Sequence, residues 1–221
     1  MTWKAVIFDL DGTLTDTLQT IAVSVDHGLA ELGLPGHTTD AYRLMVGEGV
    51  EELCRRALPD GKQHELENLL RRVRAFYDQN ILLHVRLYDG VLDLLRSLRQ
   101  RGAHLAVLSN KPDSLAQATV DGMGLRPYFD VVLGASDSLP RKPDPEAAWW
   151  VAGQLALDRE QVLFVGDTPI DVNTARAAGM ASVAVTWGFR TREELLPSEP
   201  SYLVDQPGQV LGVFDSGPEE P

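Results

Sequence analysis

The chain has 221 residues, of which 44% are hydrophobic and 24% charged, a balance typical of a folded globular protein. Its net charge of −12 disfavours nucleic acid as a partner and requires any phosphate site to supply its own positive charge. The single cysteine, Cys54, excludes an intrachain disulfide framework. The sequence shows no signal-peptide pattern and no apolar run long enough to span a membrane, so we expect a cytoplasmic protein.

The first predicted element is a short strand over residues 5–8 (AVIF), rich in β-branched and aromatic side chains. Two acidic residues, Asp9 and Asp11, follow it, and Gly12 permits a sharp turn. Alternate residues of a strand point the same way, so both carboxylates can face one site. An Asp-Gly pair is also common in simple turns, so this segment alone leaves both interpretations open.

A helical block comes next. Hydrophobic residues recur at three- and four-residue steps, and no strand pattern interrupts them before about residue 86. This spacing predicts four helices, over residues 16–34, 39–46, 49–58 and 63–83. Four helices of this length suit a small antiparallel bundle. The arginines of the last one, Arg71, Arg72 and Arg74, are interpreted as a solvated face.

From residue 88 onwards, predicted helices and strands alternate, which is typical of a parallel sheet covered on both faces. The first strand belongs to this sheet, so the helical block is an insertion. We therefore expect an α/β fold with a doubly wound, Rossmann-like core over residues 1–15 and 87–221. The helical block over residues 16–86 would form a separate helical unit inserted into this core. The last residues, 215–221, are rich in Gly, Pro and acidic residues and are expected to be disordered.

Polar residues gather where three predicted strands end. They are Asp9, Asp11 and Thr13 after the first strand, Ser109 and Asn110 after the second, and Asp167 and Asp171 after a later one. The carboxyl ends of parallel strands share one edge of a sheet, where open α/β sheets bind their ligands. Clustered carboxylates need a cation, and an all-oxygen set suits Mg²⁺. A metal beside carboxylates, with Lys142 nearby, favours phosphoryl transfer.

Four of these segments resemble the motifs of the haloacid dehalogenase-like hydrolases, and the helical block resembles their cap. The segments are DLDGT at Asp9–Thr13, SN at Ser109–Asn110, RKPDP at Arg141–Pro145 and GDTPID at Gly166–Asp171. The resemblance implies that Asp9 is the nucleophile and Asp11 the general acid and base. It implies that Ser109 and Lys142 stabilise the phosphate and the intermediate.

The resemblance also implies that Mg²⁺ is held by Asp9, the backbone carbonyl of Asp11, and Asp167. Asp171 would lie beside the metal, and the less favoured alternative is a first-turn helix residue that interacts with the helix dipole. Further residues expected to contact substrate are Leu10 and Thr13 in the first turn, Asn110, and Gly47 and Glu48 in the cap. The glycines around Glu48 fit a mobile cap loop over the site, or a plain turn between helices.

Longer stretches, among them LAVLSNKP and VGDTPIDVNTARAAGM, resemble phosphoglycolate phosphatase-like members. The expectation is Mg²⁺-dependent hydrolysis of a small phosphorylated metabolite through an aspartyl-phosphate, by a monomer or homodimer that binds neither membrane nor nucleic acid. Nucleotide or pyrophosphate hydrolysis, sugar-phosphate mutation and non-catalytic binding are the alternatives. The presence of Asp11 argues against dehalogenases, which lack this acid. The related mutases carry a histidine on the first cap helix, where this chain reads LQTIAVSV and His27 is displaced.

Overall fold

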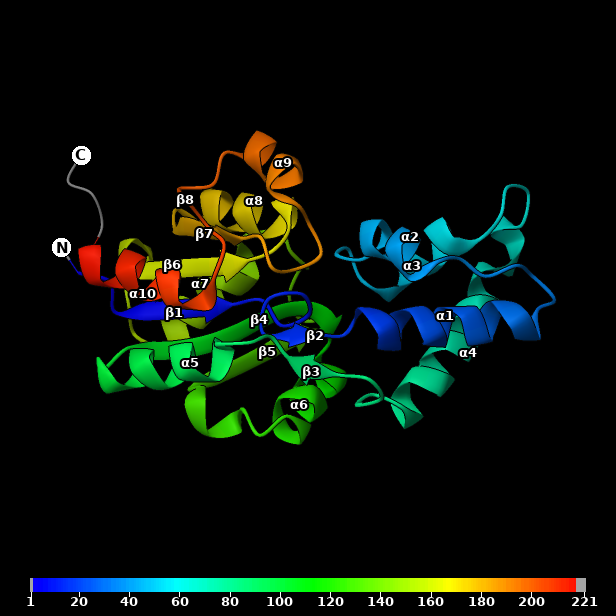
Figure 1. The fold of residues 1–221 in the computed structure, drawn as a ribbon, viewed down its shortest axis with the longest axis horizontal. Coiled ribbons are helices and arrows are strands. Elements are labelled where there is room, and N and C mark those ends of the chain that lie inside the picture. Colours follow the sequence, from blue (N-terminus) through cyan, green and yellow to red (C-terminus); the bar gives the residue numbers. More distant parts are fainter. Residues whose placement is uncertain (1, 218–221) are drawn as a thin grey trace.

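The computed structural model describes residues 2–217, which form a core lobe and a helical cap lobe lying end to end (Figure 1). Within these residues, the core lobe is built on a six-stranded sheet in which every paired strand runs parallel. In spatial order the strands are β5 (Val131–Ala135), β4 (His104–Pro112), β1 (Ala5–Phe8), β6 (Val162–Gly166), β7 (Ala181–Val185) and β8 (Tyr202–Val204). The first strand of the chain therefore lies in the middle of the sheet, between β4 and β6.

Helices cover both faces of the sheet (Figure 1). The core helices are α5 (Val91–Gln100), α6 (Asp113–Gly122), α7 (Glu146–Gln154), α8 (Pro169–Ala178), α9 (Arg192–Leu195) and α10 (Pro207–Ser216), with 3₁₀ turns at Arg126–Tyr128, Arg159–Gln161 and Leu196–Ser198. One hydrophobic cluster joins α5, α6 and α10 to Val6 and Phe8 of β1, and a second joins α7 and α8 to Ala5 and Ile7. Alternate residues of β1 thus serve opposite faces, as in a strand buried on both sides. This architecture confirms the predicted doubly wound sheet.

The cap lobe is entirely helical across its described residues. It contains α1 (Leu18–Glu31), α2 (Thr39–Met45), α3 (Val50–Ala57), a 3₁₀ turn at Gln63–Glu65 and α4 (Leu66–Gln79). These helices enclose a hydrophobic cluster of their own, separate from those in the core. Helices α1 and α4 approach closely at Gly28, where a Cβ atom would lie 2.9 Å from a methyl carbon of Leu69. A glycine at this position allows the close packing of the two longest cap helices.

The chain enters and leaves the cap through two short strands that lie side by side. β2 (Thr15–Asp16) pairs antiparallel with β3 (Arg86–Leu87). The pair is reinforced by an ion pair of 2.8 Å between Arg86 Nη2 and Asp16 Oδ2. The predicted boundaries between core and cap, at residues 15/16 and 86/87, both fall within this two-stranded ribbon and stay a prediction.

Several predicted element boundaries differ from the structure, most clearly at the end of α4 and at the C-terminal tail. Helix α4 ends at Gln79 and does not continue to residue 83, because the side-chain amide of Asn80 donates to the carbonyl of Phe76 at 2.8 Å and ends the helix there. The expected disordered tail is wrong at its start. Asp215 and Ser216 belong to α10, and the Asp215 carboxylate accepts hydrogen bonds from Arg101 at 2.8 and 3.0 Å. The remainder of that prediction, residues 218–221, lies outside the described residues.

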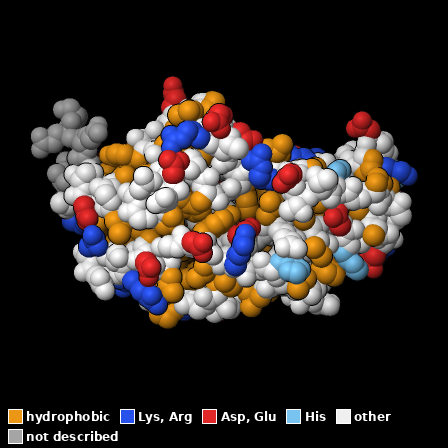
Figure 2. All heavy atoms as spheres, viewed as in Figure 1, with side chains coloured by type: hydrophobic (Ala, Val, Ile, Leu, Met, Phe, Trp, Pro, Cys, Tyr) orange, Lys and Arg blue, Asp and Glu red, His pale blue; other side chains and the backbone are white. Residues whose placement is uncertain are grey.

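The surface mixes charges of both signs. On the face shown in Figure 2, acidic and basic side chains are interspersed over both lobes. This arrangement differs from the continuous basic stripe that binding to a nucleic acid backbone requires. No helix in the described part of the chain has the length and apolar character needed to cross a membrane.

Candidate active site

Asp9 lies at the carboxyl end of β1, in the middle of the sheet edge. Its backbone N–H donates to the carbonyl of Val165 at 2.9 Å, which extends the pairing of β1 with β6 by one residue. Its Oδ1 accepts a hydrogen bond from the N–H of Leu10 at 2.7 Å and lies 2.9 Å from the Lys142 ammonium. The carboxylate is therefore buried and fixed in orientation by two donors.

Asp167 follows the neighbouring strand β6 and is fully buried. Its Oδ1 accepts from the hydroxyl of Thr13 at 2.9 Å, and its Oδ2 accepts from the N–H of Phe189 at 2.7 Å. Gly12 has a φ of 88°, and a Cβ atom there would lie 2.3 Å from Asp167 Oδ2. The glycine after Asp11 is therefore required by the neighbouring carboxylate as well as by the turn.

The carboxylates of Asp9, Asp167 and Asp171 form one buried group, with an oxygen atom of each within 4.8 Å of the others. Burial raises the pKa of Asp9 to about 6; Lys142 opposes this rise and the charge of Asp171 adds to it. Burial, together with Asp171 and Asp9, also raises the pKa of Asp167 well above its ordinary value. One lysine does not neutralise three carboxylates. The group therefore has both the oxygen donors and the excess negative charge that suit a hard divalent cation.

Lys142 is buried between two of these acids. Its ammonium lies 2.7 Å from Asp171 Oδ1, in addition to its contact with Asp9. Burial lowers the pKa of Lys142, but the charges of Asp171 and Asp9 outweigh this effect and keep the pKa above its ordinary value. The Asn110 side chain fixes the backbone around the lysine, accepting from its N–H at 2.9 Å and donating to its carbonyl at 3.0 Å.

Asp171 occupies the first-turn helix position that was one of the two alternatives for it, and its role beside a metal stays a prediction. It lies in the first turn of α8, where its Oδ2 accepts hydrogen bonds from the N–H and the hydroxyl of Thr168 at 3.0 and 2.7 Å. Its Oδ1 contacts Lys142. Asp171 thus stabilises the start of the helix and at the same time orients the lysine toward Asp9.

Asp11 has a partner that the sequence analysis missed. Both of its carboxylate oxygens lie 3.0 Å from the Lys111 ammonium, and the same ammonium donates to the hydroxyl of Tyr77 at 2.6 Å. Burial lowers the pKa of Lys111, but the charge of Asp11 and the hydrogen bonds with Tyr77 and Asp11 outweigh burial and raise it overall. Tyr77 belongs to α4 of the cap, so this chain of contacts joins the second acid of the site to the cap.

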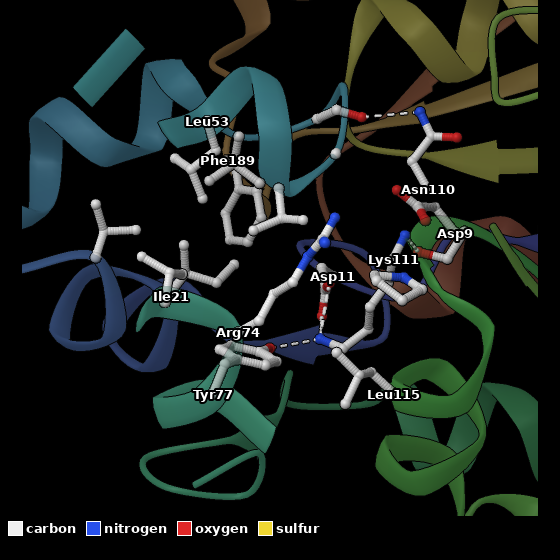
Figure 3. A pocket seen from close by; sticks show the side chains of 18 of the residues that line it. Asp9, Asp11, Ile21, Leu53, Arg74, Tyr77, Asn110, Lys111, Leu115 and Phe189 are labelled. Carbon is white, nitrogen blue, oxygen red and sulfur yellow. Dashed lines mark hydrogen bonds and ion pairs between the residues drawn. The ribbon is translucent and has the colours of Figure 1, made fainter. Parts of the chain in front are cut away.

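A pocket that is partly open to solvent lies between cap and core in front of Asp9 (Figure 3). Of the residues predicted from sequence, Asp9, Asp11, Ser109, Asn110 and Gly47 line it. Behind this lining, Lys142 contacts Asp9 and Asp171, and a carboxylate oxygen of Asp167 lies within 4.8 Å of one from each of these two acids. The structure thus brings the predicted strand ends together at one site.

Three of the predicted substrate contacts, Leu10, Thr13 and Glu48, are not among the described residues that line the pocket. Leu10 packs its side chain into the core, and the hydroxyl of Thr13 donates to Asp167. Both residues support carboxylates and lie outside the pocket lining as far as the described residues show. The two predicted residues of the cap loop have different partners. The carbonyl of Gly47 accepts a hydrogen bond from the Asn110 side chain at 3.0 Å, whereas Glu48 pairs with Arg56 at the surface.

Among the pocket residues that were not predicted from the sequence as site residues are Lys111, Tyr77, Arg74 and Phe189. Lys111 directly follows Asn110 at a strand end and could have been included on that basis. Tyr77 fits the apolar spacing of its helix and Arg74 was interpreted as part of a solvated face, so the local pattern gave no sign of either. Phe189 comes from the loop after β7, which carried no motif.

A family model for haloacid dehalogenase-like hydrolases matches residues 6–185. A phosphoglycolate phosphatase of Pseudomonas putida is 37% identical over 208 residues, covering 91% of this chain and 76% of the relative. Another, from Haemophilus influenzae, is 32% identical over 220 residues and covers 96% and 98% of the two chains.

Solved structures agree with these relatives. A crystal structure of a predicted phosphoglycolate phosphatase from Haemophilus somnus superimposes with a TM-score of 0.88 at 30% identity, covering 96% of this chain and 98% of the other. One from Lactobacillus delbrueckii gives a TM-score of 0.91 at 28% identity, with 97% and 99% covered. The chain therefore belongs to the haloacid dehalogenase-like hydrolases. Within that family it is a phosphatase of the phosphoglycolate phosphatase-like group, as the motifs predicted.

Proposed function

We propose that this phosphatase hydrolyses a small phosphate monoester of the phosphoglycolate type through an aspartyl-phosphate on Asp9, with Mg²⁺ as cofactor. The observation that carries the proposal is the placement of Asp9 and Asp11 in the lining of one pocket, with a buried lysine and two further carboxylates directly behind Asp9. The names of the relatives supply the substrate type.

The acidic group fits a magnesium ion. Asp9 and Asp167 would hold the ion through carboxylate oxygens, together with the backbone carbonyl of Asp11. Asp171, the third acid of the group, would lie beside the ion and would also hold Lys142 and Thr168 in place. When bound, Mg²⁺ would offset the negative charge of the phosphate oxygens and lower the repulsion between phosphate and nucleophile.

The residues of the chain would divide the chemistry between them. The carboxylate of Asp9 attacks phosphorus, and the bond to the leaving oxygen breaks as Asp11 donates a proton to it. Asp11 then takes a proton from water, which attacks the aspartyl-phosphate and releases phosphate and free Asp9. Lys142 and Ser109 stabilise charge on the transferred group, and Lys111 orients the Asp11 carboxylate.

In the mutase alternative, a histidine on the first cap helix would act at the site. The histidine of this chain, His27, is displaced in the sequence and packs against other residues of the cap. His27 stacks on Phe76, with ring centroids 4.3 Å apart, and lies 3.8 Å from Glu31. It is thereby engaged on the outer side of α1 and α4. A mutase requires a group that exchanges protons with the sugar at the site, and His27 is not positioned for that role.

The test is a comparison of wild-type protein with the isosteric variant Asp9→Asn. Wild-type protein is expected to release phosphate from 2-phosphoglycolate and para-nitrophenyl phosphate in a Mg²⁺-dependent manner. The variant should lose at least about 1,000-fold in kcat, because its amide is not a nucleophile. Asp40→Asn, an exposed cap position, is the matched control and should retain full activity.

Two results would contradict the proposal, and they differ. Substantial turnover by a folded Asp9→Asn variant would rule out Asp9 as the nucleophile. Phosphate binding by the wild-type protein without Mg²⁺-dependent release from any monoester would instead support a non-catalytic binding protein.

A further inference from the structure

The wall of the pocket is chemically divided. The end next to Asp9 is polar, whereas the cap side is built from aliphatic side chains, among them Ile21, Val25, Val50 and Leu53, with Phe189 from the core beside them. A substrate bound with its phosphate at Asp9 would therefore extend into mostly apolar surroundings. In such surroundings an unpaired charge is costly and a charged partner is strongly preferred.

One cation reaches this apolar part of the pocket. Arg74 of α4 lines the pocket, and its side chain points inward from the helix, toward the space between Phe189 and Asp11 (Figure 3). The other two cations near the site, Lys111 and Lys142, are already held by carboxylates at 3.0 Å or less. Arg74 is thus the cation available to a ligand among the pocket residues that the structure describes.

The arginines beside Arg74 on the same helix are used differently. Arg71 donates to Asn68 at 2.7 Å, and Arg72 pairs with Glu31 at 3.0 Å. Within residues 2–217, the guanidinium of Arg74 makes no hydrogen bond or ion pair, although acidic residues are abundant in this chain. Helix α4 therefore directs one arginine into the pocket and ties its neighbours to the surface.

We propose that Arg74 selects the substrate by binding a carboxylate at the end of the molecule opposite to the phosphate. This inference rests on the proposed function, since it assumes a phosphate monoester bound at Asp9. The planar guanidinium matches a carboxylate with two parallel hydrogen bonds, and the apolar wall strengthens the pair by excluding water. The substrate class is accordingly a phosphorylated hydroxy acid, with an aliphatic body between its two charged ends.

The experiment compares substrates that differ only in this charge. Wild-type protein and Arg74→Gln are assayed on 2-phosphoglycolate, 3-phosphooxypropanoate and 4-phosphooxybutanoate, and on the uncharged ethyl, propyl and butyl phosphates. We expect the variant to lose about 10- to 100-fold in kcat/KM on the carboxylated substrate that the wild type prefers. On the alkyl phosphates it should stay within about twofold of wild type, since no group there reaches the arginine. Arg71→Gln, one turn away on the same helix, should match the wild type on all six.

Inhibition gives a second readout that does not depend on turnover. Phosphonates with and without a terminal carboxylate are used as competitive inhibitors of para-nitrophenyl phosphate hydrolysis. The carboxylated phosphonate should lose its advantage in Arg74→Gln, and Arg74→Lys should restore part of it because a point charge remains.

The possible failures can be told apart. Equal losses by Arg74→Gln on carboxylated and alkyl phosphates would show a structural effect and overturn the inference. Unchanged kcat/KM of Arg74→Gln on both sets of substrates would also overturn the inference. If the wild-type protein hydrolyses none of the six esters with Mg²⁺, the proposed function itself fails, independently of Arg74.

Discussion

Lys111 joins three groups: the two carboxylate oxygens of Asp11 and the hydroxyl of Tyr77. We predict that Lys111→Met lowers kcat by about 10- to 100-fold, because a freely rotating Asp11 carboxylate is less often aligned with the leaving oxygen. KM should change far less. Tyr77→Phe, which keeps the ring and the ion pair, should cost only about twofold.

Steady-state kinetics with para-nitrophenyl phosphate, together with a thermal melt of each variant, measure this effect. Lys62→Met, at an exposed position in the cap, is the control and should behave as wild type. If a folded Lys111→Met variant keeps the wild-type kcat, the contact with Lys111 is not needed to orient the Asp11 carboxylate.

The raised pKa values of Asp9 and Asp167 predict how metal binding depends on pH. With a pKa of about 6, Asp9 is mostly protonated at pH 5 and mostly ionised at pH 7.5. A carboxyl group must lose its proton to bind a metal, so the affinity for Mg²⁺ should fall as the pH falls through about 6. From Asp9 alone we expect affinity about 10-fold weaker at pH 5 than at pH 7.5.

Calorimetric titration of Mg²⁺ at the two pH values measures the difference. Asp167→Asn should weaken binding at both. If affinity is the same at pH 5 and pH 7.5, the metal does not bind at these carboxylates.

At the scale of elements, the turn from β6 into α8 has two functions. Thr168 donates two hydrogen bonds to Asp171 at the start of the helix, and Asp171 in turn holds Lys142. Thr168→Val removes the hydroxyl bond and should lower the free energy of unfolding by about 1 kcal/mol, as the loss of a helix-capping interaction does. It should also lower kcat, because Lys142 loses part of its support.

Urea denaturation and kinetics on the same protein separate the two effects. Thr38→Val removes a cap at the start of α2, where the hydroxyl accepts from the N–H of Ala41. This control should lose stability and keep its kcat. A Thr168→Val variant with unchanged kcat would show that the helix start and the chemistry are independent.

The elements and their order could be predicted because each has a local signal. Alternating apolar strands and periodic helices marked the parallel core, and polar residues after Phe8, Leu108 and Gly166 marked the edge that carries the site. Contacts between cap and core could not be predicted in this way. Tyr77 meets Lys111 only because α4 folds back over the core, and no spacing in the sequence encodes that approach.

At the scale of the whole molecule, hydrogen bonds and an ion pair hold cap and core together beside the site; we call this set of contacts the clasp. Arg190 of the core donates to the cap carbonyls of Leu44 and Val46 at 3.2 and 2.9 Å, while Arg43 of the cap pairs with Glu194 at 2.9 Å. We predict that Arg190→Gln weakens docking of the cap and raises KM by about 3- to 10-fold, since an open cap binds substrate poorly.

Hydrogen exchange along α2 should become faster in the same variant, because its end loses its contacts with the core. Arg192→Gln removes an ion pair to Asp205 that lies wholly within the core, and it serves as the control. Unchanged exchange in α2 together with an unchanged KM would show that this clasp does not hold the cap.

The paired strands β2 and β3 have a consequence for how this architecture can diversify. Since they are hydrogen-bonded neighbours, the ends of the intervening segment are only one strand spacing apart. An insert of almost any length or shape can begin and end at such a point without displacing β1 or β6. One continuous stretch of the gene can therefore be exchanged while the strand ends that carry Asp9, Asp11 and Asp167 are inherited unaltered.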